Sequence, residues 1–372
     1  MTRPFNLIVS ILIVVVIAWG IAFAGPLAPM ARLGKIMYQD KDFSFNGTQS
    51  CMTCHHHKSG FADPDNQWDP VNSVVSIGAD GVSRGDRNAP SAAYAGFSPV
   101  LHWDNTANGY IGGMFWDGRA TGLILGDPLA EQALGPPLNP GEMNMPNEAA
   151  VVTVVRNSTY SNLFKQVFGT DALDDVEAAY QDIGRAIASY ERSGQVQKFS
   201  SRYDRNQMTA KEQSGQALFE MSCAKCHPAT AAQGSPGSLF TNYGYVNIGL
   251  PANPLLEGNP VDLGLGGFLE QDFNSASPLL ADGDYASQYG KFKIPTLRNI
   301  GLTAPYGHNG VFPTLKEMVE FINSRDVGNW PPPETALNLN TEDTGDLGLT
   351  TEEIDDIVAF LMSLSDAPGM RP

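Results

Sequence analysis

Apolar residues recur at the spacing of an α-helix in several parts of the chain, and polar stretches separate these parts. Three segments in the middle of the sequence have this helical pattern: residues 148–156, 160–168 and 176–192. In the last of them Ile183, Ile187 and Tyr190 fall on one face, as expected of a helix packed on a core. These segments are predicted to close a first helical domain.

Two capping boxes predict where helices begin in the second half of the chain. Thr209 with Glu212 forms the first box, and Thr350 with Glu353 forms the second. An apolar stripe follows each box: Ala217, Leu218 and Met221 after the first, and Ile354, Ile357, Val358 and Leu361 after the second. Both segments are therefore predicted to be amphipathic helices of a second domain.

Long stretches of small and polar residues lie between the helical segments. Residues 59–108 are rich in Gly, Asp, Asn and Ser, and residues 228–291 are rich in Gly, Pro and Asn. Because the chain has 38 Gly and 26 Pro, much of it is predicted to be loop, which a cofactor would help to hold. The polar residues 195–207 place the domain boundary, so that residues 26–205 and 206–372 form the two predicted domains.

The first 25 residues are predicted to direct export. Arg3 precedes an apolar run that extends from Phe5 to about Ala24. The triplet at 22–24 is typical of a signal-peptidase site, yet the run approaches the roughly 20 apolar residues that span a bilayer. A cleaved signal peptide and a retained membrane anchor both remain open. In either case the rest of the chain is predicted to lie in the periplasm, since no later segment is apolar for long enough to cross again.

Length and charge narrow the class of protein. A chain of 372 residues, 42% of them hydrophobic, is long enough for two domains with cores of their own. The formal net charge of −17 argues against nucleic-acid binding, which needs a basic surface. The acidity either keeps the protein soluble or steers a basic or neutral redox partner, and the sequence leaves both interpretations open.

All four cysteines belong to two copies of one motif. These copies are Cys51-Met52-Thr53-Cys54-His55 and Cys223-Ala224-Lys225-Cys226-His227. C-x-x-C-H is the attachment signature of haem c, in which two thiols bond the porphyrin and the next His binds the iron. A zinc site made of two C-x-x-C pairs, or two redox disulfides, would not explain a His directly after each pair. The sequence therefore predicts two covalently bound haems.

The two motifs lie 172 positions apart (223 minus 51), a spacing that suits two tandem cytochrome-c-like domains, each enlarged by insertions. The predicted fold is mainly α, with long loops and an N-terminal signal or anchor helix.

Four further stretches carry a resemblance to a known family. They are Gly85-Asp86-Arg87-Asn88-Ala89-Pro90, Phe115-Trp116-Asp117-Gly118-Arg119-Ala120, residues 130–136 with Glu142-Met143-Asn144, and residues 295–299 with 303–310. In this order, around two haem motifs, the chain resembles the bacterial di-haem cytochrome c peroxidases and MauG over nearly its whole length after residue 30.

The resemblance implies roles for three residues near the first haem. Glu142 and Gln132 would lie on its distal side, where hydrogen peroxide binds, with Glu142 as the acid-base group. Trp116 would lie between the haems and relay an electron. Outside the family pattern, Glu142 would be read as a solvated loop residue and Trp116 as a core aromatic.

The resemblance also implies a calcium site where the two domains meet. Its ligands would be the side-chain oxygen of Asn88 and the backbone carbonyls of Thr303 and Pro305, completed by water. Because these ligands come from both domains, a bound ion would fix the relative position of the haems.

The chain departs from the family pattern in two places. Relatives that need reductive activation carry a distal His shortly before the Arg-Asn-x-Pro stretch, whereas residues 76–81 contain none. An open distal position at the first haem, as in MauG, is therefore the hypothesis, although His56, His57 or His102 could reach that iron from a loop.

The second departure concerns the second haem. Related chains carry a distal Met or Tyr where this chain has Ile322, which cannot bind iron. Met318, one helical turn earlier, is the candidate ligand, and the alternative is an ordinary core methionine.

Three functions follow from these features. The first is reduction of hydrogen peroxide with electrons from a small periplasmic donor such as a cytochrome c or a cupredoxin. The second is a MauG-like oxidase that modifies a residue of a partner protein, and the third is a two-haem electron carrier. A membrane contact is expected only through an uncleaved N-terminal segment, and the sequence leaves homodimer formation open.

Overall fold

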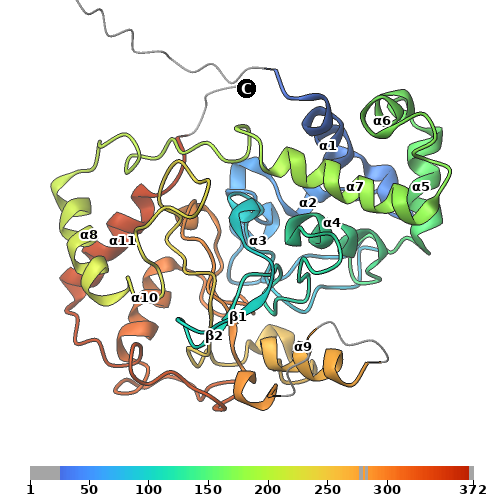
Figure 1. Ribbon diagram of the computed structural model, residues 1–372. Coiled ribbons are helices and arrows are strands. Elements are labelled where there is room, and N and C mark those ends of the chain that lie inside the picture. The colour runs from blue at the N-terminus through green and yellow to red at the C-terminus, as the bar shows by residue number, and fades with distance from the viewer. Residues whose placement is uncertain (1–25, 276–279, 281–283, 368–372) are drawn as a thin grey trace, which may run out of the picture.

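The computed structural model describes residues 26–275, 280 and 284–367. It contains two groups of helices side by side, joined by long irregular segments (Figure 1). The chain is thus mostly helical with little sheet, in agreement with the predicted fold class. The predicted export segment, residues 1–25, lies outside the described residues. Within the described ranges, no helix combines the length and the hydropathy that a membrane crossing requires.

The first group of helices comes from the first half of the chain. Its members are α1 (Pro29–Gln39), α2 (Cys51–Cys54), α3 (Pro64–Trp68), α4 (Pro128–Leu138), α5 (Glu148–Asn157), α6 (Ser161–Phe168) and α7 (Val176–Glu191). Helices α5, α6 and α7 confirm the three segments that were predicted from helical periodicity.

The second group comes from the second half. It consists of α8 (Ala210–Ser222), α9 (Gly264–Phe273), α10 (Leu315–Ser324) and α11 (Thr351–Ser363). Both predicted capping boxes are present, because the hydroxyl of Thr209 accepts from Glu212 N and that of Thr350 from Glu353 N. Helix α9 was not predicted, since its glycine-rich sequence has low intrinsic helix propensity and lies in a stretch interpreted as loop.

A glycine lets α1 and α7 cross closely in the first half. A Cβ on Gly34 of α1 would lie 1.8 Å from the carbonyl oxygen of Ala186 on α7, so only glycine fits there. One turn further along each helix, the rings of Tyr38 and Tyr190 meet edge to face at 5.2 Å between centroids.

The second half repeats this arrangement. A Cβ on Gly215 of α8 would lie 1.9 Å from the carbonyl oxygen of Asp356 on α11. Again one turn further along, Phe219 and Phe360 are in ring contact at 5.1 Å. Each half therefore crosses an early helix with a late helix at a glycine and an aromatic pair, as expected of two tandem copies of one fold.

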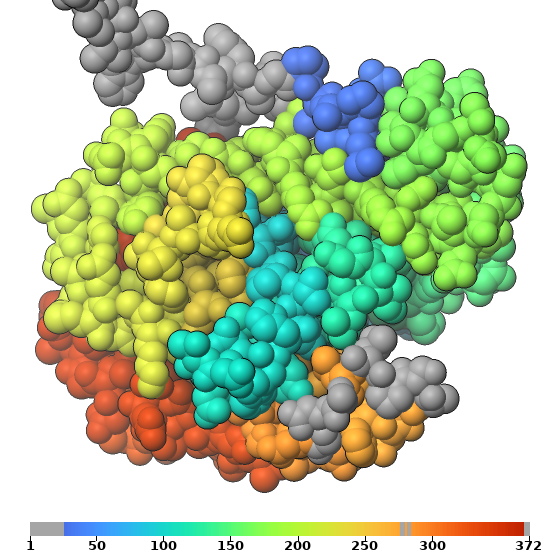
Figure 2. All heavy atoms as spheres, in the orientation of Figure 1, coloured from blue at the N-terminus to red at the C-terminus, as the bar shows by residue number. Residues whose placement is uncertain are grey.

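Sheet is limited to two short antiparallel pairs. Strand β1 (His102–Asp104) pairs with β2 (Gly109–Ile111) in the first, and β3 (Tyr245–Val246) pairs with β4 (Phe292–Lys293) in the second. Trp103 faces Tyr110 in the first register, and Val246 faces Phe292 in the second. In Figure 2 the segment around β1 and β2 (cyan) fills the surface between the two helical groups.

Short 3₁₀ helices occur within the irregular segments. They are Lys41–Phe43, His57–Ser59, Ala95–Phe97, Pro254–Leu256, Ala286–Gln288 and Ile300–Leu302.

A buried arginine holds the segment between α7 and α8 against the second half. Arg298 is 1% exposed, and its guanidinium pairs with Asp204 at 2.7 Å and donates to the carbonyl oxygen of Ser238 at 2.7 Å. Because a buried charge needs both a counter-ion and hydrogen-bond acceptors, this network fixes the connecting segment in one position.

Candidate haem-binding active site

The first C-x-x-C-H motif places the Cys54 thiol and the His55 imidazole in the wall of one cavity. Ser50 caps α2, which carries Cys51 and Cys54, and His55 follows at its end. The Nδ1 atom of His55 lies 3.1 Å from the carbonyl oxygen of Phe61. Since a carbonyl only accepts, Nδ1 donates and Nε2 keeps its lone pair for a metal. Burial lowers the pKa of His55, which favours the neutral imidazole that ligation requires.

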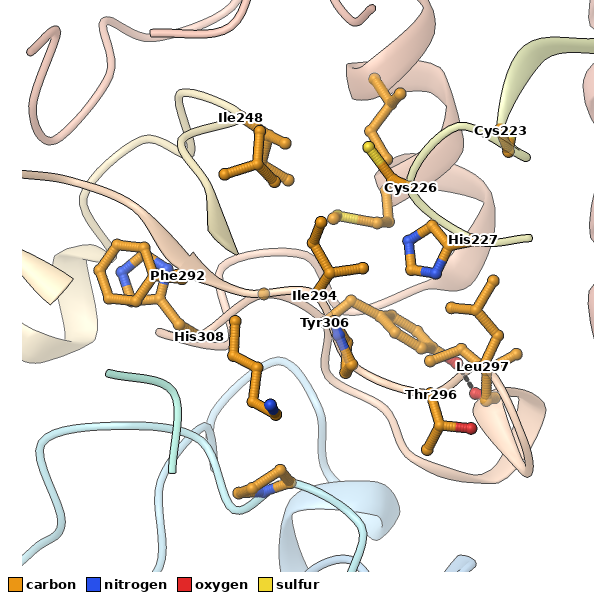
Figure 3. Close-up of a pocket in the computed structure, with 18 of the residues that line it drawn as sticks. Cys223, Cys226, His227, Ile248, Phe292, Ile294, Thr296, Leu297, Tyr306 and His308 are labelled. Carbon is orange, nitrogen blue, oxygen red and sulfur yellow. Dashed lines mark hydrogen bonds between the residues drawn. The ribbon is translucent and has the colours of Figure 1, made fainter. Parts of the chain in front are cut away.

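The second motif repeats this arrangement after α8. The Nδ1 atom of His227 donates to the carbonyl oxygen of Phe240 at 2.7 Å, and burial lowers the pKa of His227 to about 4. Cys226 lies beside the imidazole in the wall of a second cavity (Figure 3). The residues of both motifs therefore fit a covalently attached haem with an axial histidine.

The alternatives to haem find no support in the described residues. The four thiols form no disulfide. A zinc site would need Cys, His, Asp or Glu side chains gathered around one point, and no group of three or more occurs in the described part of the chain.

The cavity beside His55 brings together residues that are far apart in sequence. It has a volume of about 1450 Å³, and its lining includes Cys54, His55, Gln132, Glu142 and Trp116. Gln132 comes from α4, and Glu142 from the turn that follows this helix. The three residues that the family resemblance singled out thus share one cavity with the first axial histidine.

Glu142 is held inside this cavity by the end of α4. Asn139, at the helix C-cap, donates from Nδ2 to Glu142 Oε1 at 2.8 Å and accepts from Gly141 N at 2.9 Å. Burial raises the pKa of Glu142, while the nearby Arg119 guanidinium opposes this shift. A carboxyl with a raised pKa exchanges protons more readily near neutral pH, which suits an acid-base group.

Arg119 and Glu191 are among the charged residues of this cavity to which the sequence assigned no role. Arg119 stacks on the Phe115 ring at 3.9 Å and pairs with Asp117 at 2.8 Å. The short sequence Phe-Trp-Asp-Gly-Arg contained this signal, but only its Trp had been assigned a role. Glu191, at the end of α7, also lines the cavity, and nothing in its helical pattern distinguishes it from a surface residue.

The carboxyl of Glu191 is buried, and one of its oxygens has no hydrogen-bond partner among the described residues. Glu191 is only 4% exposed, and its Oε2 atom accepts no hydrogen bond from the described residues. Burial raises the pKa of Glu191 to about 8, although Arg192 acts in the opposite direction. The surroundings of Glu191 therefore favour the protonated, uncharged carboxyl.

Trp116 lines the first and the second cavity at the same time. Its indole Nε1 donates to the carbonyl oxygen of Asn88 at 2.9 Å, and its own carbonyl oxygen accepts from Lys293 N at 2.8 Å. The first bond fixes the ring and the second fixes the Trp116 backbone, so both halves of the chain hold this residue. The Trp116 indole thus lies between the two cavities.

The histidines proposed as alternative distal ligands do not line the first cavity. His56, His57 and His102 are absent from its lining, whereas His308, which was not predicted, lines both cavities. The His308 ring is stacked on Phe292 at 3.5 Å, and its Nε2 lies 3.3 Å from Glu334 (Figure 3). The Nε2 atom of His308 is thus engaged by Glu334, and its ring is held against Phe292.

The second cavity contains the remaining predicted residues. Met318 and Ile322, both on α10, line it together with His227. Asn88, Thr303 and Pro305 line it as well, so the three predicted calcium ligands lie around one space. Asn88 donates from Nδ2 to Val74 O at 3.0 Å, which leaves its side-chain oxygen as the atom available to a cation.

Comparisons with known proteins agree with this geometry. Residues 28–213 match the profile of the di-haem cytochrome c peroxidase family, and residues 212–365 match that of cytochrome c. The chain is 38% identical to the methylamine utilization protein MauG of Paracoccus denitrificans, over 91% of this chain and 88% of that protein. It is 32% identical to the cytochrome c551 peroxidase of Nitrosomonas europaea, over 92% and 82%.

A solved structure is also similar. The crystal structure of the diheme peroxidase BthA from Burkholderia thailandensis aligns with a TM-score of 0.79 at 31% identity, covering 93% of this chain and 88% of that one. The chain therefore has two cavities with haem motifs, a match to the family profile over half of its length, and relatives above 30% identity over nearly all of it. It belongs to the di-haem cytochrome c peroxidase family, whose members are oxidoreductases and include MauG.

Proposed function

We propose that this protein reduces hydrogen peroxide at the cavity beside His55, with electrons that arrive through the cavity beside His227. The observation that carries the proposal is that the half-buried Glu142 lines the first cavity while Trp116 lines both. Haem held by Cys51, Cys54 and His55 would supply the iron that binds peroxide and takes up its oxidising equivalents. Haem held by Cys223, Cys226 and His227 would pass electrons inward.

The chain's own residues would transfer the proton and orient the bound peroxide. Hydrogen peroxide needs two electrons and two protons to become two waters, and breaking its O–O bond requires one oxygen to lose a proton while the other gains one. Glu142 would move this proton, and the amide of Asn139 holds its carboxyl in place. Gln132 would orient the peroxide by hydrogen bonding, and Trp116 would carry the electrons between the two cavities.

Three further assignments belong to this proposal. We propose an open distal position at the first haem, because no histidine occurs at residues 76–81 and none of the alternative histidines reaches the cavity. Met318 is the proposed distal ligand of the second haem. Ca²⁺ is the proposed occupant of the site around Asn88, Thr303 and Pro305, whose neutral oxygens suit a hard cation.

The proposal extends to the cellular location of the protein and to the kind of electron donor. The apolar N-terminal run and the covalent haem motifs support a periplasmic location. The net charge of −17 supports an electron donor with a basic or neutral docking surface.

The test compares peroxide turnover by the haem-loaded wild type and Glu142→Gln, with a reduced small cytochrome c as donor. Loss of the acid-base group should lower kcat by about 10²- to 10⁴-fold. The matched control is Glu177→Gln, which removes the same charge from an exposed position in the first turn of α7. Full activity in Glu142→Gln would refute the role of this carboxyl.

A MauG-like oxidase that modifies a partner protein is the second candidate. Two observations favour it: the identity of 38% to MauG of Paracoccus denitrificans and the absence of a histidine at residues 76–81. Rapid consumption of peroxide with negligible oxidation of the donor cytochrome would support the oxidase over the peroxidase. Family membership favours either enzyme over a simple two-haem electron carrier.

A further inference from the structure

Lys293 is a half-buried cation that has no carboxylate partner among the described residues. It belongs to β4 and lines the cavity beside His227, but not the cavity beside His55. Its Nζ atom donates to Ser98 Oγ at 3.0 Å and to the carbonyl oxygen of Gly112 at 2.8 Å. Within the described part of the chain, no Asp or Glu forms an ion pair with it, so one of its three N–H donors remains for another acceptor.

A second unpartnered donor lies close to this ammonium group. The Lys293 Nζ atom is 5.5 Å from the ring centroid of Tyr243, which lines the same cavity. The hydroxyl of Tyr243 is buried and has no hydrogen-bond partner among the described residues. A buried polar group without a partner is unfavourable, and a charge removed from water is more so. Both groups therefore indicate an acceptor that the described residues do not supply.

The charge state of Lys293 agrees with a missing anion. Burial lowers the pKa of Lys293 to about 7, because no acidic group offsets the loss of water. An anion in the cavity would restore the charged form. Haem is the group that the His227 motif binds, and it carries two propionate carboxylates.

We infer that Lys293 and Tyr243 together bind one propionate of the haem held by His227, and that Lys293 thereby helps to set the reduction potential of that haem. This inference rests on the proposed assignment of a haem to the second motif. A positive charge near haem iron disfavours the ferric state, which carries more positive charge than the ferrous state. Lys293 therefore raises the potential of the second haem and favours the arrival of electrons there.

The position of Lys293 connects this charge to the path between the haems. Its backbone N–H donates to the carbonyl oxygen of Trp116 at 2.8 Å, and its side chain reaches Ser98 and Gly112 in the first half of the chain. One residue thus contacts the proposed relay, both halves of the chain and the second haem cavity. We therefore describe Lys293 as a positioning residue: its side chain would bind the haem propionate, and its backbone N–H holds Trp116.

The experiment measures the midpoint potentials of both haems by spectroelectrochemistry in the haem-loaded protein, without peroxide. Lys293→Met should move the second haem to a more negative potential and leave the first haem nearly unchanged. A unit charge about 12 Å from the iron, at an effective dielectric constant of about 20, should shift the electron distribution between the haems by about tenfold. Lys293→Arg should retain most of the wild-type potential, and Tyr243→Phe should cause a smaller shift in the same direction.

The neighbouring Lys291 provides a matched control. It lies two residues earlier, lines neither cavity, and donates to Gln288 Oε1 at 3.1 Å. Lys291→Met removes the same charge and should leave both potentials unchanged. Equal potentials in Lys293→Met and Lys291→Met, or a shift confined to the first haem, would overturn the inference.

Two variants keep the test decisive if Lys293→Met does not load haem. A shift in Tyr243→Phe with retention in Lys293→Arg supports propionate binding, whereas wild-type potentials in Tyr243→Phe together with a shifted Lys293→Arg contradict it. Because no peroxide is present, the result does not depend on whether the proposed peroxidase activity is correct.

Discussion

Replacement of Glu191 by Gln should change the pH dependence of stability in a defined direction. Glu191 is buried beside the first cavity, and its Oε2 atom has no partner among the described residues. Burial raises its pKa from the ordinary value of 4.5 to about 8. The folded protein therefore holds a proton on Glu191 under conditions in which the unfolded chain has already released it.

The sign and size follow from proton linkage. Below about pH 4.5 the carboxyl is protonated in both states, and Glu191 carries no penalty. As the pH rises, the unfolded chain releases the proton first, so the folded state loses stability until the pH passes about 8. At about 1.4 kcal/mol per pKa unit, the full difference is about 5 kcal/mol, which is a large share of a typical free energy of unfolding.

Glu191→Gln removes this titration and keeps the side-chain shape. The free energy of unfolding, measured with urea and far-UV circular dichroism on the haem-loaded protein, should be similar for variant and wild type near pH 5. At pH 8–9 the variant should be the more stable protein by several kcal/mol. Glu177→Gln, which changes an exposed residue of the same helix, should follow the wild type at every pH.

One result would refute this reasoning. If the wild type and Glu191→Gln lose stability in parallel between pH 5 and pH 9, then Glu191 is ionised in the folded protein. In that case a partner, such as a water or the bound haem, satisfies its carboxylate.

Four further predictions concern the haems, the proposed ion and the packing. Trp116→Phe removes the bond from Nε1 to Asn88 O and should slow oxidation of the donor cytochrome in stopped-flow measurements, while peroxide binding, followed by the haem spectrum, stays normal. Met318→Ala should abolish any spectral band due to a methionine ligand on the second haem, and an unchanged spectrum would reject this assignment. Chelation of Ca²⁺ should lower the melting temperature of the wild type but not that of Asn88→Ala. Gly215→Ala places a Cβ 1.9 Å from the carbonyl oxygen of Asp356 and should destabilise the second domain by about 3 kcal/mol, measured by urea unfolding.

The sequence by itself determined the features that depend on short-range chemistry. Two thiols and a histidine in five consecutive residues are sufficient to attach a haem, so both motifs could be identified without the fold. The same holds for helices with a strong apolar stripe or a capping box, such as α7, α8 and α11, because spacing and capping act within one or two turns. Helix α9 was missed because its glycines weaken the local signal, and its contacts with the rest of the chain outweigh this deficit.

The tertiary structure alone decided which distant residues share a cavity. Family resemblance pointed to Glu142, but its place in the cavity wall and its bond to Asn139 follow from the turn that ends α4. Among the described residues, Glu191 Oε2 has no hydrogen-bond partner and Lys293 has no carboxylate partner, and neither fact could be inferred from the sequence. The burial and the electrostatic environment of a residue are set by segments that lie far apart in the chain. The sequence near that residue therefore does not indicate which groups will surround it.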